Sequence, residues 1–191
     1  MPRIHTVRGR RTSNGSAMIL TDLELENAIV DELQRHTVLS LATVGRAGPH
    51  AVSLLYAHKD FDMYWLSDPK TSHSGQLAQN PSAAVSIAAQ QDDFRKLRGL
   101  QIAGNAYRIA DPDEAARGFD LLVARYPFLK QFAAGKLARH LRLAAVYLFR
   151  SNKLTLIDNS RGFGFKQTLE LADRSVEATN IDASTAQGDV A

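Results

Sequence analysis

The chain has 191 residues, of which 45% are hydrophobic and 23% are charged, and its formal net charge is +3. This length and apolar content are typical of one domain with a full hydrophobic core. The sequence contains no cysteine, which excludes disulfides, iron–sulfur clusters, thiolate zinc sites and thiol nucleophiles, so any redox chemistry must come from a bound cofactor.

Residues 1–20 are a basic arm, which we expect to be flexible or packed against a partner. Its arginines are Arg3, Arg8, Arg10 and Arg11. A basic arm can bind nucleic acid, but this one lacks interleaved aromatic residues and no nucleic-acid-binding module follows it. The arm also lacks the hydrophobic segment of a secretory signal, and no apolar run approaches the roughly 20 residues that span a bilayer. We therefore expect a cytoplasmic protein without nucleic-acid or membrane partners.

The ordered domain is predicted to span residues 21–170 and to begin with a helix. Thr21 and Glu24 form a capping box, and apolar residues follow at helical spacing to about residue 36. Three alternating, β-branched segments separated by tight turns come next: 37–44, 50–57 and 63–67. Short strands joined in this way predict an antiparallel meander.

The second half of the domain adds further strands and helices. We expect strands over 82–89, 100–109, 143–149 and 154–157, a helix beginning after Asp111, and a second helical piece over 127–138. Gly104 lies inside a long strand, which suggests a bulge. Residues 171–191 contain no aromatic side chain and are predicted to be a disordered tail. Seven strands with peripheral helices predict a mainly β fold, an antiparallel barrel.

The clearest functional signal lies in residues 64–81. An aromatic, apolar strand ends at Ser67, and a short helical turn then opens with Lys70, Thr71, Ser72 and His73. Free backbone N–H groups at a helix N-terminus, beside hydroxyl and cationic side chains, form an anion site. Two plainer interpretations stay open from the residues alone. Thr71 is then only a helix cap and Lys70 a solvated charge, and His73 is an exposed helix residue instead of a phosphate ligand.

Residues 64–81 closely resemble the phosphate-binding segment of the flavin-binding split barrels related to pyridoxamine 5′-phosphate oxidase. The order of elements across residues 22–168 is similar to that fold. Residues 158–166, Asp-Asn-Ser-Arg-Gly-Phe-Gly-Phe-Lys, resemble the Asp-Asn-x-x-Gly-Phe-Gly-x-Lys signature of a bacterial subfamily. The resemblance implies a split antiparallel β-barrel that forms a homodimer and binds FMN in a groove between its two subunits.

The resemblance also implies which residues bind the cofactor. The isoalloxazine would lie along the strand that contains Ala51, Val52, Ser53, Leu54 and Tyr56, and the ribityl chain would lie between Leu66 and Ser67. The phosphate would be held by Lys70, Thr71, Ser72 and His73. The partner subunit would reach the cofactor with Arg98 and Gly99. For His50 and Tyr56, packing inside the barrel is an equally good interpretation. Relatives place an arginine where this chain has Ser72, and a serine hydroxyl donates one neutral hydrogen bond in place of a bidentate fork. FMN binding that is weak or absent therefore stays open.

The function implied by the resemblance is that of an FMN-dependent oxidoreductase acting on a small-molecule substrate. No catalytic residue can be named from the sequence, because in flavoenzymes the cofactor carries the chemistry. The alternative is a non-catalytic protein that holds flavin or haem for carriage or sensing. The histidines show no metal-binding spacing, so we expect no metal site.

Overall fold

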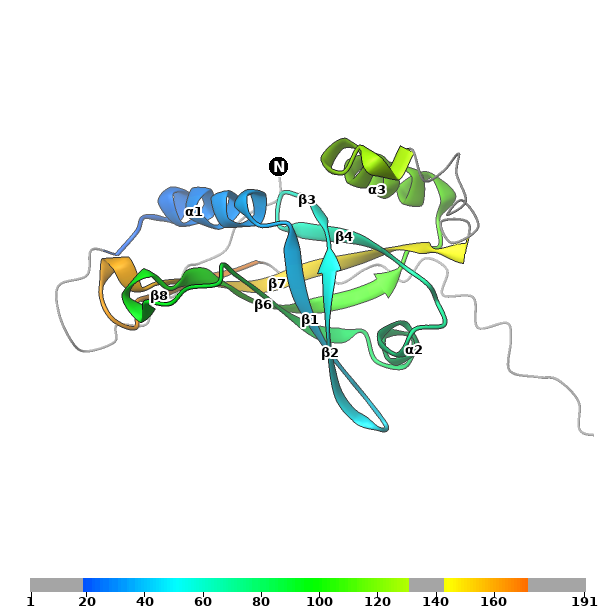
Figure 1. Ribbon diagram of the computed structural model, residues 1–191, viewed down its shortest axis with the longest axis horizontal. Helices are drawn as coiled ribbons and strands as arrows, with labels where there is room; N and C mark the ends of the chain where they lie inside the picture. The colour runs from blue at the N-terminus through cyan, green and yellow to red at the C-terminus, as the bar shows by residue number, and fades with distance from the viewer. Residues whose placement is uncertain (1–18, 131–142, 172–191) are drawn as a thin grey trace, which may run out of the picture.

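The structure, a computed structural model, describes residues 19–130 and 143–171 (Figure 1). The predicted arm up to residue 18, the helical piece from residue 131 onwards and the tail from residue 172 lie outside the described residues. The strands are β1 (Val38–Gly45), β2 (Gly48–Leu55), β3 (Ala57–Lys59), β4 (Asp62–Ser67), β5 (Ser82–Ala88), β6 (Arg98–Arg108), β7 (Ala145–Asp158) and β8 (Lys166–Glu170). The helices are α1 (Asp22–Arg35), α2 (Ser72–Gln79) and α3 (Pro112–Arg125), and the short 3-10 turns are η1 (Phe94–Lys96) and η2 (Asn159–Arg161).

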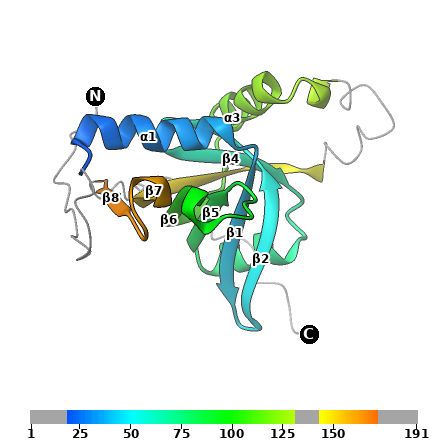
Figure 2. The ribbon, with the colours of Figure 1, turned by 60° about the vertical axis from the view of Figure 1, so that its left-hand side comes forward.

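All eight strands belong to one antiparallel sheet that curls into a half-barrel (Figures 1 and 2). The strand order is β2-β1-β5-β6-β7-β4-β3, and β8 pairs with β7. β2 and β3 are therefore the two ends of this path, and the sheet does not close between them. The predicted meander is correct for its first two strands, which pair as β1 and β2. It is wrong for the third, because β4 pairs with the short β3 and with β7 and not with β2. The mainly β split barrel with peripheral helices that the sequence predicts is confirmed.

α1 lies along one side of the curled sheet and closes the main core (Figure 2). Its capping box is present, because the Thr21 side chain accepts from the Glu24 N–H and the Glu24 carboxylate accepts from the Thr21 N–H at 2.8 Å. The buried stripe of α1 consists of Leu25, Ile29 and Leu33. Burying each of these side chains stabilises the fold by about 1.5–3 kcal/mol, which fixes the helix on the sheet.

The other two helices pack on different parts of the sheet. α2 contacts β1, β2 and β6, whereas α3 contacts β3, β4 and β7. α3 begins as the sequence predicts, with the Asp111 carboxylate accepting from the Glu114 N–H at 2.7 Å and Pro112 in the first turn. None of the described helices has the length and apolar content that crossing a bilayer requires.

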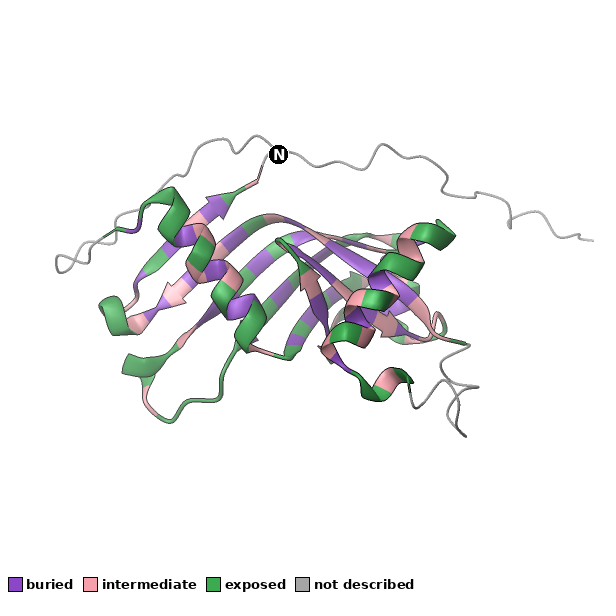
Figure 3. Ribbon diagram, turned by 90° about the horizontal axis from the view of Figure 1, so that it is seen from above, coloured by how far each residue is buried: buried purple, intermediate pink, exposed green. Residues whose placement is uncertain are grey.

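Buried and exposed residues alternate along the strands, which gives the sheet two distinct faces (Figure 3). One face is the core under α1, where Trp65, Tyr56 and Phe149 are the largest fully buried side chains. The other, which we call the outer face, carries mostly small side chains on its central strands. Examples are Ala42 on β1 and Ala84 on β5, which lie opposite each other in the register.

The structure differs from the sequence prediction in the last strands. The predicted strands 143–149 and 154–157 merge into one continuous strand, β7, which begins at Ala145. The polar Ser151 between them does not turn the chain but donates its hydroxyl to the Phe61 carbonyl at 2.6 Å. β8 was not predicted, since its polar sequence lacks an apolar strand pattern. The bulge at Gly104 is confirmed: the register with β7 shifts there, and a Cβ on this residue would lie 2.0 Å from the Arg150 carbonyl oxygen.

Candidate functional site

The first turn of α2 lacks the side-chain cap that the other two α-helices of the described chain have. Thr71 occupies the N-cap position, but its hydroxyl makes no capping hydrogen bond. In α1 and α3 the corresponding residues, Thr21 and Asp111, do cap the helix. The first N–H groups of an α-helix have no partner within the helix, so those of α2 are open to an acceptor from outside.

The side chains around this turn form a buried polar cluster of their own. The His73 Nε2 atom lies 2.6 Å from the Ser67 hydroxyl and 3.2 Å from the Thr71 hydroxyl, which is 2.8 Å from that of Ser74. Ser67, His73 and Ser74 are buried. Burial, and to a smaller extent the nearby His50, lower the pKa of His73, which favours the neutral imidazole. Nε2 of His73 is thus engaged inside the protein, while the backbone N–H of His73 belongs to the uncapped first turn of α2.

Lys70 and Ser72 are the exposed members of the predicted phosphate group. The Lys70 N–H donates to the Asp68 carboxylate at 2.9 Å, which fixes the tight turn between β4 and α2. The Thr71 hydroxyl lies 2.9 Å from the Asp68 carbonyl, inside the same turn. The ammonium of Lys70 is the cationic group of this turn, and the hydroxyl of Ser72 is free to join it.

Two contacts fasten α2 to the hairpin formed by β1 and β2. The rings of His50 and His73 are stacked, with centroids 6.3 Å apart and planes at 4°. The Gln76 side chain accepts from the Thr43 hydroxyl at 2.5 Å and donates to the Gly48 carbonyl at 3.4 Å. These contacts place the start of β2 beside the first turn of α2. Sequence reasoning missed Gln76, because nothing local distinguishes it from a solvated glutamine.

β2 pairs with β1 alone among the described strands, so one of its edges carries unpaired backbone groups. Ala51 and Ser53 are exposed on the outer face, whereas Val52 and Leu54 are half-buried and pack against the core. An unpaired strand edge presents a row of N–H and C=O groups. Such a row matches the polar edge of an isoalloxazine, which carries both donors and acceptors.

Two of the predicted cofactor residues lie away from this region. Tyr56 is fully buried, its hydroxyl donates to the Leu33 carbonyl at 2.8 Å, and burial raises the pKa of its phenol. Its contacts in the structure are therefore those of core packing. Leu66 is half-buried in the cluster that α3 covers, with Leu122 and Tyr126.

Arg98 and Gly99 lie at the start of β6. The Nε atom of Arg98 is 2.9 Å from the Glu32 carboxylate and 3.9 Å from that of Asp158. A Cβ on Gly99 would lie 2.2 Å from the Ile87 carbonyl oxygen, so this position allows close approach of two backbones. Within one subunit, therefore, the Arg98 side chain engages α1 and the end of β7, and not the first turn of α2.

The loop from Asp158 to Lys166 presents an exposed aromatic pair. Asn159 donates to the Phe94 carbonyl at 2.7 Å and accepts from the Gly164 N–H at 3.1 Å, which ties this loop to η1. Gly162 and Gly164 have φ of 143° and 75°, conformations that favour glycine. Phe163 is 81% exposed and meets Phe94 edge to face. The two glycines thus shape a loop that holds Phe163 outside the core.

The outer face contains a hollow of about 530 Å³ across β1, β5, β6 and β7. Half of its lining residues are alanine or serine; Lys153 is its charged member, and the Lys153 ammonium lies 3.8 Å from the Glu170 carboxylate. Of the predicted cofactor residues, Ala51 lines this hollow.

Known proteins are similar to this chain in sequence or in fold. The UPF0306 protein YhbP of Salmonella paratyphi A is 29% identical over 112 residues, which cover 59% of this chain and 69% of that protein. A heme binding protein from Mycobacterium smegmatis superposes with a TM-score of 0.60 at 21% identity, over 76% of this chain and 57% of that one. A FAD-binding protein from Mesorhizobium loti gives a TM-score of 0.55 at 17% identity, over 78% of this chain and 94% of that one. The family model for pyridoxamine 5′-phosphate oxidase matches residues 25–148, well over half of the sequence. The chain therefore belongs to the pyridoxamine 5′-phosphate oxidase family.

Proposed function

We propose that this protein binds FMN and is a flavin-dependent oxidoreductase that acts on a small-molecule substrate. The observation that carries the proposal is the open first turn of α2 beside the unpaired edge of β2. A phosphate suits uncapped helix N–H groups, and a flavin ring suits a strand edge with free donors and acceptors. Membership of the pyridoxamine 5′-phosphate oxidase family supports this combination.

Different residues of this chain would contact the phosphate and the ring of FMN. The backbone N–H groups of Ser72 and His73, the Ser72 hydroxyl and the Lys70 ammonium would hold the phosphate. The backbone of Ala51–Leu54 would contact the ring. When bound, the flavin supplies the hydride or electron transfer. The neutral His73, held by Ser67, would then position the first turn and would not neutralise the phosphate charge.

We further propose that the protein acts as a homodimer whose two copies pack through their outer faces. The low charge and small side chains of this face support that arrangement, and two-fold dimers are the commonest oligomers. Ala84→Glu would place a carboxylate in the middle of the face and is expected to give monomers in sedimentation at micromolar concentration. Ala116→Glu, on the exposed side of α3, is the matched control and should leave the dimer intact.

The experiment that tests the function is the visible spectrum of the purified protein, followed by titration with FMN. A flavin spectrum, or saturable FMN binding by the apoprotein, is the expected result. Oxidation of a reduced nicotinamide with concomitant bleaching of the flavin would support the oxidoreductase. A colourless protein that does not bind FMN would remove the flavin proposal.

Haem is the second candidate ligand, and the similarity to the mycobacterial heme binding protein is the observation that favours it. None of the residues lining the outer hollow is a histidine, cysteine, methionine or tyrosine, the side chains that usually ligate haem iron. A Soret band in the purified protein, or tighter binding of haem than of FMN, would favour a carrier over a flavoenzyme.

A further inference from the structure

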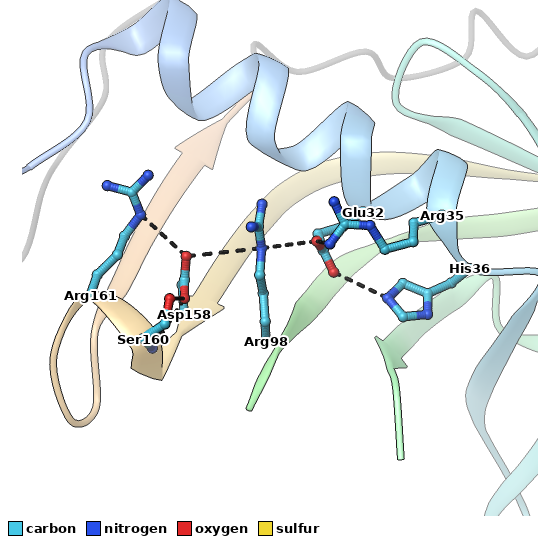
Figure 4. Close-up of polar contacts among 7 residues, drawn as sticks. All are labelled: Glu32, Arg35, His36, Arg98, Asp158, Ser160 and Arg161. Carbon is cyan, nitrogen blue, oxygen red and sulfur yellow. Dashed lines mark hydrogen bonds and ion pairs between the residues drawn. The ribbon is translucent and has the colours of Figure 1, made fainter. Parts of the chain in front are cut away.

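A row of alternating charges runs along the side of α1 that faces the ends of β6 and β7 (Figure 4). Asp158 lies 3.2 Å from Nε of Arg161 and 3.9 Å from Nε of Arg98. Nε of Arg98 is also 2.9 Å from Oε1 of Glu32, and Nη1 of Arg35 is 3.3 Å from the same oxygen. Three guanidinium groups are thus held in sequence by two carboxylates.

The two carboxylates are buried and already well supplied with partners. The Glu32 side chain is 1% exposed, and its second oxygen lies 3.1 Å from Nε2 of His36. The Asp158 side chain is 3% exposed and accepts from the N–H and hydroxyl of Ser160 at 3.2 and 2.5 Å. A buried carboxylate requires an ion-pair partner, but these two share three arginines. Within the row, one positive charge is therefore left without a buried counter-charge.

The arginines keep part of their donor capacity for solvent. Their side chains are 31% (Arg98), 36% (Arg161) and 59% (Arg35) exposed. The contacts of Arg98 and Arg161 are made through Nε, and Figure 4 shows their terminal nitrogens pointing away from the carboxylates. A guanidinium has five N–H donors, so each still has terminal donors to offer. No described residue accepts a hydrogen bond from the terminal nitrogens of Arg98.

The surroundings of the row make it a fixed receptor and not a flexible basic patch. The buried carboxylates alternate with the guanidinium groups along the row and limit their orientation through these ion pairs (Figure 4). The exposed Glu24 also interacts electrostatically with Arg161, but its own oxygen is held by Thr21, and its pKa is lowered mainly by the hydrogen bond from the Thr21 N–H. Guanidinium groups arranged in advance lose less side-chain entropy when they bind oxyanions in a bidentate manner.

We propose that Arg35, Arg98 and Arg161 form an anion-binding site for an extended oxyanion of the di- or oligophosphate class. A row of three cations matches a chain of linked phosphates better than a single compact anion. The site lies along α1, on other elements than the α2 turn and the β2 edge. Arg98 is the residue that it shares with the cofactor contacts implied by the family resemblance, so the variants that test it change only the two outer arginines, Arg35 and Arg161. Its test uses different residues and a different ligand from the FMN experiment.

Isothermal titration with sodium pyrophosphate, inorganic phosphate and ADP tests this site in the full chain. Pyrophosphate is expected to bind with measurable heat and more tightly than phosphate. ADP binding at the same residues would mean that the site binds the diphosphate of a nucleotide. Binding of pyrophosphate but not ADP would mean that it binds the free anion. The absence of pyrophosphate binding at millimolar concentration would overturn the proposal.

The matched variants are Arg35→Gln/Arg161→Gln and Arg108→Gln/Arg117→Gln. The first pair removes the two outer guanidinium groups and leaves Arg98 to neutralise the buried acids. Its pyrophosphate affinity should fall at least about tenfold, the scale of one charge-assisted hydrogen bond. The second pair removes two exposed arginines elsewhere and should change affinity less than about twofold. Equal losses in both pairs would show attraction by net charge alone and would sink the site.

An NMR readout keeps the proposal testable if the first pair does not fold. In the unaltered protein, pyrophosphate should shift the Nε–H signals of Arg35, Arg98 and Arg161 along one saturable curve. The signals of Arg108 and Arg117 should stay in place. Saturable shifts confined to arginines outside the row would contradict the assignment.

Discussion

Two polar regions of this molecule, one along α1 and one at the start of α2, both contain cationic side chains and a histidine, but these side chains have different partners. Along α1, arginines and a histidine surround the buried carboxylates of Glu32 and Asp158. At the start of α2, hydroxyls and a neutral histidine bond to one another, and the helix N-terminus is left uncapped. The difference teaches that the residue type does not identify an anion site. What matters is which donors remain after the protein's own acceptors have been satisfied.

Removing a buried carboxylate of the α1 row is expected to have the largest effect. Glu32→Ala should lower the free energy of unfolding by about 3–5 kcal/mol, because it leaves Arg98 and His36 without their buried partner. Glu24→Ala, on the exposed first turn of the same helix, should cost only about 1 kcal/mol as a lost cap. Urea denaturation of both variants measures the contrast.

A second substitution tests whether the stability loss in Glu32→Ala comes from the unpaired Arg98. In the double variant Glu32→Ala/Arg98→Ala, part of the lost stability should return, since the unpaired cation is removed as well. Equal stability losses in Glu32→Ala and Glu24→Ala would mean that the row does not hold α1 to the sheet.

Adding a cation at the α2 turn should convert a weak anion site into a stronger one. Ser72→Arg is expected to tighten FMN binding about 10- to 100-fold, the scale of one or two charge-assisted hydrogen bonds, and to leave riboflavin binding unchanged. Gln79→Arg adds the same charge at the exposed far end of α2 and serves as the control.

Flavin fluorescence titration of these variants separates the phosphate from the ring. If Ser72→Arg tightens riboflavin as much as FMN, the added side chain contacts the ring or the ribityl chain, and the phosphate lies elsewhere. If Gln79→Arg tightens FMN equally, only the net charge of the helix matters.

Stability should depend on pH through His73. Its pKa in the folded protein is lowered, so below a pH of about 6.5 the unfolded chain binds more protons than the folded one. The free energy of unfolding therefore falls as the pH falls from there, and it is unaffected by this group at higher pH. In His73→Gln this decline should be shallower, as urea unfolding at a series of pH values would show.

His58 has a lowered pKa for the same main reason, burial, and contributes a decline of the same sign. The variant His58→Gln measures its share, and the double variant should show the weakest pH dependence of the three. An unaltered slope in His73→Gln would mean that its ring is already protonated, or equally solvated, in the folded protein.

The smallest effect concerns the rigidity of α2. Gly75→Ala should stabilise the protein by about 0.5–1 kcal/mol, because nothing apart from the neighbouring helix backbone lies within 4 Å of the new Cβ and alanine favours the helix. FMN affinity should not change. Gly45→Ala is the contrasting variant, since its Cβ would lie 2.6 Å from Gln76 and would disturb the contact between α2 and the hairpin. Thermal unfolding distinguishes the two.

The parts of the fold that local rules determine could be predicted from the sequence. The caps at Thr21 and Asp111, the hairpin of β1 and β2 and the bulge at Gly104 all depend on neighbouring residues or on one residue type. The third strand of the predicted meander does not, because β4 pairs with β3 and with the distant β7 and not with β2. The continuity of β7 could not be predicted, because the polar Ser151 indicates a turn. Only its hydrogen bond to Phe61, 90 residues away, shows that the strand continues. Register across a sheet is a non-local property.

The candidate sites show the same limit. The sequence placed hydroxyls and cations at the α2 turn, but it could not show that the His73 ring bonds inward to Ser67. A signal for the α1 row was present in Glu32, a charged residue among the apolar positions of the helix stripe. Its partner Arg98 lies 66 positions further along the chain, so the spacing gave no hint of the pair.

The long strand β7 has a consequence for how the chain folds. It pairs with β4, β6 and β8, and it joins Met63 to Phe149, 86 residues further along. During synthesis on the ribosome, β4 therefore waits for most of the polypeptide before its partner emerges. Contacts of such high sequence separation make folding slow and leave strand edges exposed meanwhile. We expect refolding to be limited by the docking of β7, and a nascent chain that ends before residue 145 to be prone to aggregation.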